Sequence, residues 1–217
     1  MRVVTDGLPH PLRSDALGNR ERIIEAARAV FAAEGVNAPM RQIARRAGVA
    51  PATLYRRFPT KEMLVTEAFT EQMHACHDIV DEGLADPDPW HGFCLVIERM
   101  CELHARDHGF TAAFVAAFPK AVDFEARREY ALTGIAELAR RAMAAGRLRP
   151  DFVLDDVLLV LMANSGIRAT SPAARITASR RFAALAIQAF RASPDASPLP
   201  PLAGLTPPAS AGPERTS

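Results

Sequence analysis

The stretch GVAPATLYRRFPTKE, residues 48–62, decides the fold of the N-terminal part because it alternates chain breakers with a short helical pattern. Gly48 can take the left-handed conformation that ends a helix, and Pro51 suits the first turn of the next helix. Pro59 disfavours helical geometry in the residue before it, so this second helix must be short. Thr60 has the side chain of a helix N-cap. The stretch therefore predicts two helices joined by a tight turn, followed by a new helix.

The rest of the chain shows the 3.6-residue period of amphipathic helices and no convincing strand alternation. Breaks at Gly and Pro divide this pattern into separate segments. The expected helices span about 20–34, 39–48, 51–58, 60–84, 90–107, 110–118, 122–145, 151–169 and 173–191. We therefore predict an all-α fold of about nine helices.

The domain organisation follows from length and composition. With 217 residues, 49% of them hydrophobic, the chain can bury a substantial core. We expect a flexible arm over 1–17, a small helical domain over 18–64, a larger helical domain over 65–192 and a disordered tail over 193–217, which is rich in Pro, Ser, Ala and Gly.

Charge is distributed unevenly along the chain. Residues 1–61 hold 11 Lys and Arg against 5 Asp and Glu, whereas residues 62–217 hold 15 against 20. A local excess of cations favours a surface that binds a polyanion, although a merely solvated charged face is the alternative. The three cysteines form no CxxC pair, which suits a reducing compartment.

No segment has the pattern of a secretory signal or of a membrane span. The longest apolar runs, such as residues 157–163, are far shorter than the roughly 20 residues that a span needs. We expect a soluble, cytoplasmic protein with no membrane partner.

The helices expected on either side of Gly48 form a helix-turn-helix, a unit whose second helix enters the major groove of DNA. Leu54 and Phe58 lie four residues apart in that second helix and face a small core. The other side chains are left facing outward or sideways, where they can meet phosphates and bases: Pro51, Ala52, Thr53, Tyr55, Arg56 and Arg57.

Two longer stretches, RIIEAARAVFAAEG (22–35) and MRQIARRAGVAPATLYRRFPTKEMLV (40–65), resemble the N-terminal domain of the TetR family of transcriptional regulators. The resemblance covers about residues 20–66. Its paired patterns, IA-x-x-AGV and TLY-x-x-F-x-x-KE, are far more specific than a bare helix-turn-helix. It implies a three-helix DNA-binding domain joined by a long helix to a C-terminal domain that binds a ligand and dimerises.

By that resemblance, four residues should hold the DNA backbone through its phosphates: Thr53, Tyr55, Arg57 and Lys61. Arg57 stands where many members have His, which strengthens the cationic contact. Ala38 stands where the family often has Ser or Thr, so no hydroxyl contact is assigned there.

Base readout is assigned to Arg41, Pro51 and Ala52. Arg41 is best able to address guanine, because its guanidinium can donate to O6 and N7 together. The remaining arginines of the motif could equally contact the DNA backbone or belong to a solvated surface: Arg45, Arg46 and Arg56.

The segment after residue 65 resembles no family that we can name, so its function is predicted from side-chain chemistry. A cavity with sparse polar points would suit a small, mainly apolar effector, and an ordinary packed core is the alternative. The expected lining is Phe93, Ile97, Met100, Phe114, Phe118 and Met162, with His104, Asn164 and Ser165 as the polar points.

The last two helices carry the pattern of a subunit interface. The helix over 151–169 is apolar nearly all round, so it must be covered on two sides. The final helix places small and apolar residues on one face: Ala178, Phe182, Leu185, Ala186 and Ala189. We predict a homodimer through these two helices.

Two weaker interpretations concern cysteine and histidine. Cys101, His104 and His108 are spaced so that they could hold a metal, and Cys76 with Cys101 could sense redox state. Isolated helical residues of these types are more often core or surface groups, so we assign no metal and no cofactor.

The combined expectation is a homodimeric regulator that binds double-stranded DNA, most simply a repressor released from a near-palindromic operator by the effector. A DNA-binding dimer that needs no ligand is the main alternative. An enzyme with an appended helix-turn-helix is weakly supported, because the sequence has no Gly-rich phosphate loop, nucleophile elbow or placed catalytic pair.

Overall fold

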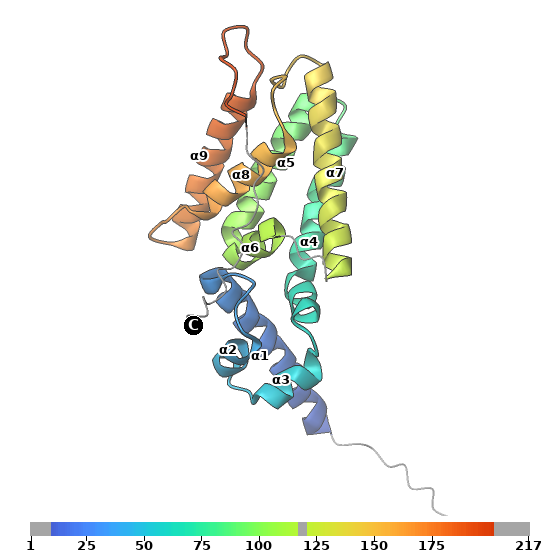
Figure 1. Cartoon of the computed structure of the whole chain (residues 1–217), viewed down its shortest axis with the longest axis vertical. Coiled ribbons are helices and arrows are strands. Elements are labelled where there is room, and N and C mark those ends of the chain that lie inside the picture. The colour runs from blue at the N-terminus through green and yellow to red at the C-terminus, as the bar shows by residue number, and fades with distance from the viewer. Residues whose placement is uncertain (1–9, 117–120, 202–217) are drawn as a thin grey trace, which may run out of the picture.

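The computed structural model describes residues 10–116 and 121–201, and within them every regular element is an α-helix. The helices are α1 (His10–Glu34), α2 (Met40–Ala47), α3 (Pro51–Arg57), α4 (Lys61–Ala85), α5 (Pro89–Arg106), α6 (His108–Ala116), α7 (Val122–Ala144), α8 (Leu154–Ser165) and α9 (Pro172–Phe190). The all-α prediction of about nine helices is confirmed for this part of the chain (Figure 1).

The helices form two lobes (Figure 1). The helices α1, α2 and α3 make the small N-terminal lobe, and α4 leaves it to run beside α7 in the larger one. With 25 residues, α4 is about 37 Å long, so it spans both lobes. The central helix α5 packs against α4, α7, α8 and α9, and α6 lies at the junction, in contact with both α1 and α8.

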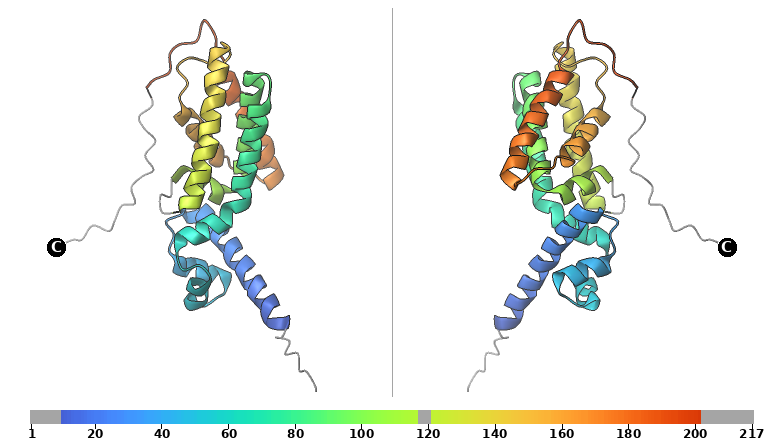
Figure 2. Two further views of the ribbon diagram at one scale, coloured as in Figure 1. Left: turned by 90° about the vertical axis from the view of Figure 1, so that its right-hand side faces the viewer. Right: turned by 90° about the vertical axis from the view of Figure 1, so that its left-hand side faces the viewer.

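The first helix begins at His10, ten residues earlier than predicted. Pro11 falls in the first turn, where its missing N–H costs no helical hydrogen bond, and Gly18 is tolerated inside a helix. Residues 10–17 of the expected flexible arm are therefore helical, and residues 1–9 lie outside the described part. Figure 2 shows α1 projecting away from the bundle at its N-terminal end.

The helix-turn-helix has the geometry predicted from its helix-breaking Gly and Pro residues. Gly48 has φ 66° and ψ 32°, and its N–H donates back to the carbonyls of the last turn of α2. Pro51 opens α3, and α3 ends at Arg57, just before Phe58. One boundary was wrong: Pro39 is the N-cap of α2, with φ −66°, and not its first helical residue.

The helix predicted over 151–169 is shorter than expected. The helix α8 starts at Leu154, because the carboxylate of Asp156 turns back to accept the N–H of Val153 at 2.9 Å. It stops at Ser165, where Gly166 follows. The residues after Gly166 form the connection to α9.

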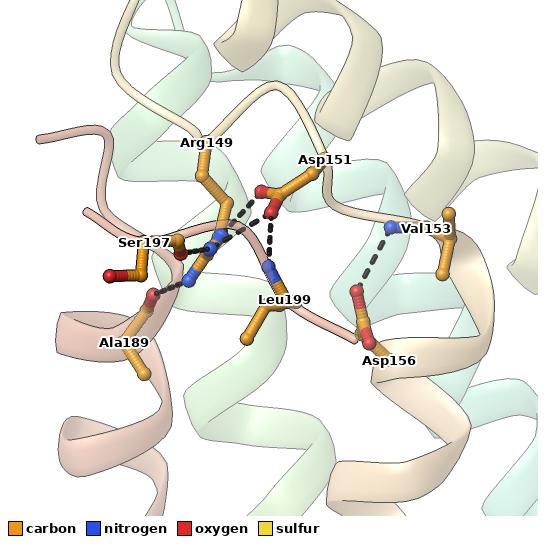
Figure 3. Close-up of polar contacts among 7 residues, drawn as sticks. All are labelled: Arg149, Asp151, Val153, Asp156, Ala189, Ser197 and Leu199. Atoms are coloured by element: carbon orange, nitrogen blue, oxygen red, sulfur yellow. Dashed lines mark hydrogen bonds and ion pairs between the residues drawn. The ribbon is translucent and has the colours of Figure 1, made fainter. Parts of the chain in front are cut away.

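The C-terminal tail is fixed in its first part, which corrects the prediction of a disordered segment from 193 onward. Arg149 forms an ion pair with Asp151 at 2.5 Å and donates to the carbonyl of Ser197 at 2.9 Å (Figure 3). Asp151 in turn accepts the N–H of Leu199 at 2.8 Å. We call this group the Arg149 clamp. The rest of the expected tail, residues 202–217, lies outside the described residues.

Aromatic rings join the two lobes. The ring of Phe31 in α1 lies 6.0 Å from that of Phe69 in α4, which lies 5.8 Å from Phe110 in α6. Next to Phe110, a Cβ built on Gly109 would lie only 2.7 Å from the carbonyl oxygen of Arg28 in α1. The backbone of α6 therefore packs directly against the backbone of α1.

Two glycines give opposite expectations for stability. Gly48→Ala should lower the free energy of unfolding by about 1 to 2 kcal/mol, because φ is positive there and nothing else lies within 4 Å of a new Cβ. Gly18→Ala, inside α1, should raise it by up to about 1 kcal/mol. Urea denaturation of both variants checks this, and changes of the same sign would contradict it.

Candidate functional site

The helix α3 packs on the core through one buried side. Leu54 and Phe58 are buried, as predicted, and they belong to one hydrophobic cluster with Phe31, Ile43 and Ala47. The rest of the helix is open: Pro51, Ala52, Tyr55, Arg56 and Arg57 are exposed, and Thr53 is half-buried. The structure thus presents all the predicted α3 contact residues around the buried pair.

The helix α2 adds cations to the same lobe. Its inward side consists of Met40, Ile43, Ala44 and Ala47, which are buried. Arg41, Arg45 and Arg46 are all exposed, with Arg41 in the first turn and the other two in the last. The arginines of α2 and α3 therefore belong to two packed helices of one motif.

Lys61 has a role that the sequence did not show. Its Nζ donates to the carbonyl of Asn37 at 3.0 Å, which ties the start of α4 to the loop between α1 and α2. Partial burial lowers the pKa of this ammonium, although Glu62 opposes the shift. An ammonium has three donors, so two remain for a phosphate. Thr60 caps the same helix by accepting the N–H of Met63 at 3.2 Å, as predicted.

Arg20 is a second residue that sequence reasoning missed. Its guanidinium lies over the ring of Phe58, 5.3 Å from the centroid, and it pairs with Glu67 of α4 at 2.6 Å. It thereby fixes the end of α3 against the long helix. The residues are far apart in sequence, so no local pattern signals the contact.

The comparisons with known proteins agree with this geometry. Residues 23–68 match the family model of bacterial regulatory proteins of the TetR family. A TetR transcription regulatory protein from Mycobacterium vanbaalenii is 31% identical over 83% of this chain and 99% of that one, with a TM-score of 0.41.

The chain belongs to the TetR family.

Other TetR regulators share its fold. The ketosteroid transcriptional regulator KstR2 of Mycobacterium tuberculosis is 22% identical, with a TM-score of 0.59 over 80% of this chain and 95% of that one. The regulator FadR from Bacillus subtilis, solved with stearoyl-CoA, is 19% identical, with a TM-score of 0.50 over 77% and 97%. A search of curated proteins gives no match. The family model covers the helix-turn-helix, so the chain is a TetR-family transcriptional regulator with a DNA-binding helix-turn-helix.

The residues predicted to line an effector cavity do not all lie together in this TetR regulator. Ile97, Met100 and His104 are buried along α5, and Phe114 makes ring contact with His104. Phe93 is buried too, but at the other end of α5, where it contacts the rings of Trp90, Phe152 and Phe190.

Two residues of that predicted lining need separate comment. Met162 was wrong as a lining residue of this subunit, because it is 39% exposed on the outer side of α8. A helix that is apolar nearly all round does not show by its pattern which side faces inward. Phe118 lies outside the described residues.

Of the three predicted polar points, His104 and Asn164 are fully buried. Burial lowers the pKa of His104 to about 3, so its ring is neutral at pH 7. Its Nδ1 lies 3.0 Å from the hydroxyl of Thr111. Asn164 donates through Nδ2 to the carbonyl of Cys101 at 2.8 Å. Among the residues that the structure describes, His104 Nε2 and Asn164 Oδ1 have no hydrogen-bond partner. Ser165, by contrast, donates to the carbonyl of Met162 in its own helix.

The histidines and cysteines considered for metal or redox chemistry have other neighbours. In the described ranges, no group of three or more His, Cys, Asp or Glu is placed to hold a metal ion. Nε2 of His108 lies 3.1 Å from Nη1 of Arg175. Burial raises the pKa of the Cys76 thiol, and raises that of Cys101 to about 12, so both remain protonated and weakly reactive.

No helix in residues 10–116 or 121–201 is long and apolar enough to cross a bilayer.

Proposed function

We propose that this TetR regulator is a homodimeric repressor that binds a near-palindromic operator in the cytoplasm and is released by a small, mainly apolar effector. The observation that carries the proposal is the one-sided anchoring of α3. Leu54 and Phe58 hold the helix on the core and leave its polar side open for the major groove.

The proposed DNA contacts are of two kinds. Thr53, Tyr55, Arg57 and Lys61 hold phosphates, while Arg41, Pro51 and Ala52 read bases, with Arg56 as a further backbone contact. The position of Lys61 supports this division, because its bond to the carbonyl of Asn37 holds the ammonium in place before DNA arrives. A donor that is already held loses less conformational entropy on binding.

The two kinds of contact predict different effects of mutation. Lys61→Ala should weaken binding to all sequences and reduce the slope of log affinity against log salt by about 1. Arg41→Ala should relax preference at one base pair, at a cost of about 1 to 3 kcal/mol. Selection of an operator from random duplexes, followed by anisotropy titrations at several salt concentrations, measures both.

Arg140→Ala is the matched control, because this exposed arginine of α7 pairs with Glu137 in the larger lobe. It should leave DNA binding unchanged. If Arg41→Ala kept the full base preference of the parent, the assignment of Arg41 to readout would be wrong.

The proposed subunit interface uses the outer faces of α8 and α9. Leu159, Met162 and Leu185 are 43%, 39% and 55% exposed, and Phe182 and Ala186 beside them are half-buried. The two helices pack against each other, so these side chains form adjoining surfaces. Covering them with a second copy would bury exposed apolar area and place two α3 helices for successive major grooves.

Leu185→Glu should therefore convert the dimer to a monomer, because a buried unpaired carboxylate is costly. Sedimentation equilibrium of the purified chain gives the mass. Met63→Glu is the control, since Met63 is similarly exposed, at 51%, but lies on α4 near the DNA-binding lobe. An unchanged mass for the Leu185 variant would refute this interface.

Release by an effector requires a mechanical link between the lobes, and α6 is our candidate. Its backbone meets α1 at Gly109, and its Phe110 continues the line of rings from Phe31 and Phe69. An effector that displaced α6 would move α1 and α4 together and change the spacing of the two recognition helices. It must bind the released state more tightly, since equal affinity shifts no equilibrium. The relative FadR was solved with stearoyl-CoA, which supports a small-molecule effector in this fold.

Gly109→Ala tests this link. The new Cβ would lie 2.7 Å and 3.1 Å from backbone atoms of Arg28 and Ala32, so α6 must move away from α1. We expect weaker operator binding without any effector, and a loss of about 1 to 3 kcal/mol of stability from overpacking. Gly18→Ala is the control. A folded Gly109→Ala protein with parental operator affinity would exclude α6 as the link.

A further inference from the structure

A hydrogen bond between two basic side chains joins α6 to α9. Nε2 of His108, the first residue of α6, lies 3.1 Å from Nη1 of Arg175 in the first turn of α9. A guanidinium has N–H donors and no acceptor, so Nε2 must be the unprotonated acceptor of a neutral imidazole whose ring proton is on Nδ1. The contact therefore exists in only one protonation state of His108.

Protonation of His108 reverses the sign of this contact. The new proton would be on Nε2, the atom that faces Nη1 of Arg175, and two cations would then lie side by side. The guanidinium would lose its acceptor where its Nε is already buried without a partner among the described residues. Attraction between α6 and α9 would thus become repulsion.

The surroundings of His108 favour the neutral ring. Burial is the main cause that lowers the pKa of His108, the charges of Arg175 and of Arg168 add to it, and Asp107 opposes it. The carboxylate of Asp107 is engaged elsewhere, because it accepts the N–H of Phe110 at 2.9 Å and a proton of the Gln72 amide at 3.0 Å. The ring is therefore neutral near pH 7.

Charged groups on the other helices around α6 have partners of their own. Arg28 of α1 donates to the carbonyl of Ala68 at 2.6 Å and lies 3.8 Å from Glu71 of α4. Arg106 of α5 pairs with Glu102. The acidic residues of α8 lie in its first turn, at the other end of that helix from Arg168. The response of the contact to acid is therefore assigned to His108.

The contact lies at the point where α6 meets the DNA-binding lobe. Figure 1 shows α6 above the end of α1 and close to the start of α9. Gly109, the next residue after His108, brings the backbone of α6 against that of α1. Arg175 belongs to α9, one of the two helices of the proposed subunit interface. His108 thus ties the turn of α6 that contacts α1 to an interface helix.

We propose that the contact between His108 and Arg175 is an acid-sensitive joint, in which protonation of His108 separates α6 from α9 and lowers the affinity for operator DNA. This inference rests on the proposed function, because it takes α6 as the link between the lobes.

The direction of the pH response follows from linkage. The pKa of His108 is lower in the folded state than the value of about 6.5 in an unfolded chain. The contribution of the contact to stability is therefore complete above about pH 6.5 and is lost as the pH falls below it. A state in which α6 has moved away from α9 takes up the proton more readily, so acid favours the released state.

The first experiment measures operator affinity of the full chain by fluorescence anisotropy at constant salt, from about pH 7.5 to about pH 5.5. One proton taken up only on release lowers the affinity by up to about tenfold per subunit over this interval. His108→Gln keeps an acceptor for Arg175 but does not titrate. It should bind like the parent at pH 7.5, and the parent should lose at least roughly threefold more affinity in acid.

His74→Gln is the matched control, because His74 is an exposed histidine of α4, and it should follow the parent at every pH. The buried His104 is present in all three proteins, so its own titration cancels from the comparison. Equal pH profiles for the parent and His108→Gln would overturn the inference, and so would a parental affinity that rises in acid.

NMR of ¹⁵N-labelled histidine tests the contact directly. The His108 signals are those absent from His108→Gln or, should that variant not fold, from His108→Asn. In the parent at pH 7.5, Nε2 should be unprotonated, and the ring should titrate below about pH 6.5. In Arg175→Met the titration midpoint should rise, because a neighbouring cation has been removed. A proton on Nε2 at neutral pH would contradict the joint.

Thermal unfolding without DNA separates this inference from the proposed function. As the pH falls below about 6.5, the parental midpoint should fall further than that of His108→Gln. If the parent selects no operator, the proposed function fails, and this melting difference still decides whether the joint exists. If Gly109→Ala weakens operator binding while the parent and His108→Gln share one pH profile, α6 stands as the link and the role of His108 fails.

Discussion

The contact between α6 and α1 is the constraint on which the rest of the structure depends. Phe31 belongs to the core that holds the recognition helix, Phe69 to the helix that spans both lobes, and Phe110 to the helix beside His104. Because Gly109 lets the two backbones meet, no side chain at this position can absorb a shift of α6. The DNA-binding lobe and the interior of the larger lobe are therefore continuous in their packing. A change of packing in one lobe shifts residues of the other.

The sequence predicted those parts of the fold that local chemistry controls. Gly48, Pro51 and Thr60 each act on the backbone within a few residues, so their identities alone place the turn, the start of α3 and the start of α4. The start of α1 could not be placed in this way, because Pro11 and Gly18 are compatible with a helix as well as with an arm. Contacts between distant segments were also invisible, such as Lys61 with Asn37 and Arg20 with Glu67.

The predicted interior shows a second limit. Periodicity identifies an apolar stripe but not the element that covers it, so Met162 was assigned to a cavity although it faces outward. The polar residues were more informative, since His104 and Asn164 were singled out by their chemistry and are both fully buried. Which of their atoms lack partners depends on the rotation of each side chain, and only the structure provides that.

The Arg149 clamp has a consequence for how the larger lobe unfolds. Its hydrogen bonds join the loop before α8 to the segment after α9 (Figure 3), so they close residues 149–199 into a loop that contains both helices. Arg149 bonds to the carbonyl of Ala189 in the last turn of α9 as well as to Ser197, so the end of α9 cannot open without breaking bonds to the loop before α8, and we expect these two segments to open together in amide exchange. The contacts that hold α8 and α9 together therefore lie within one chain and do not require a second subunit.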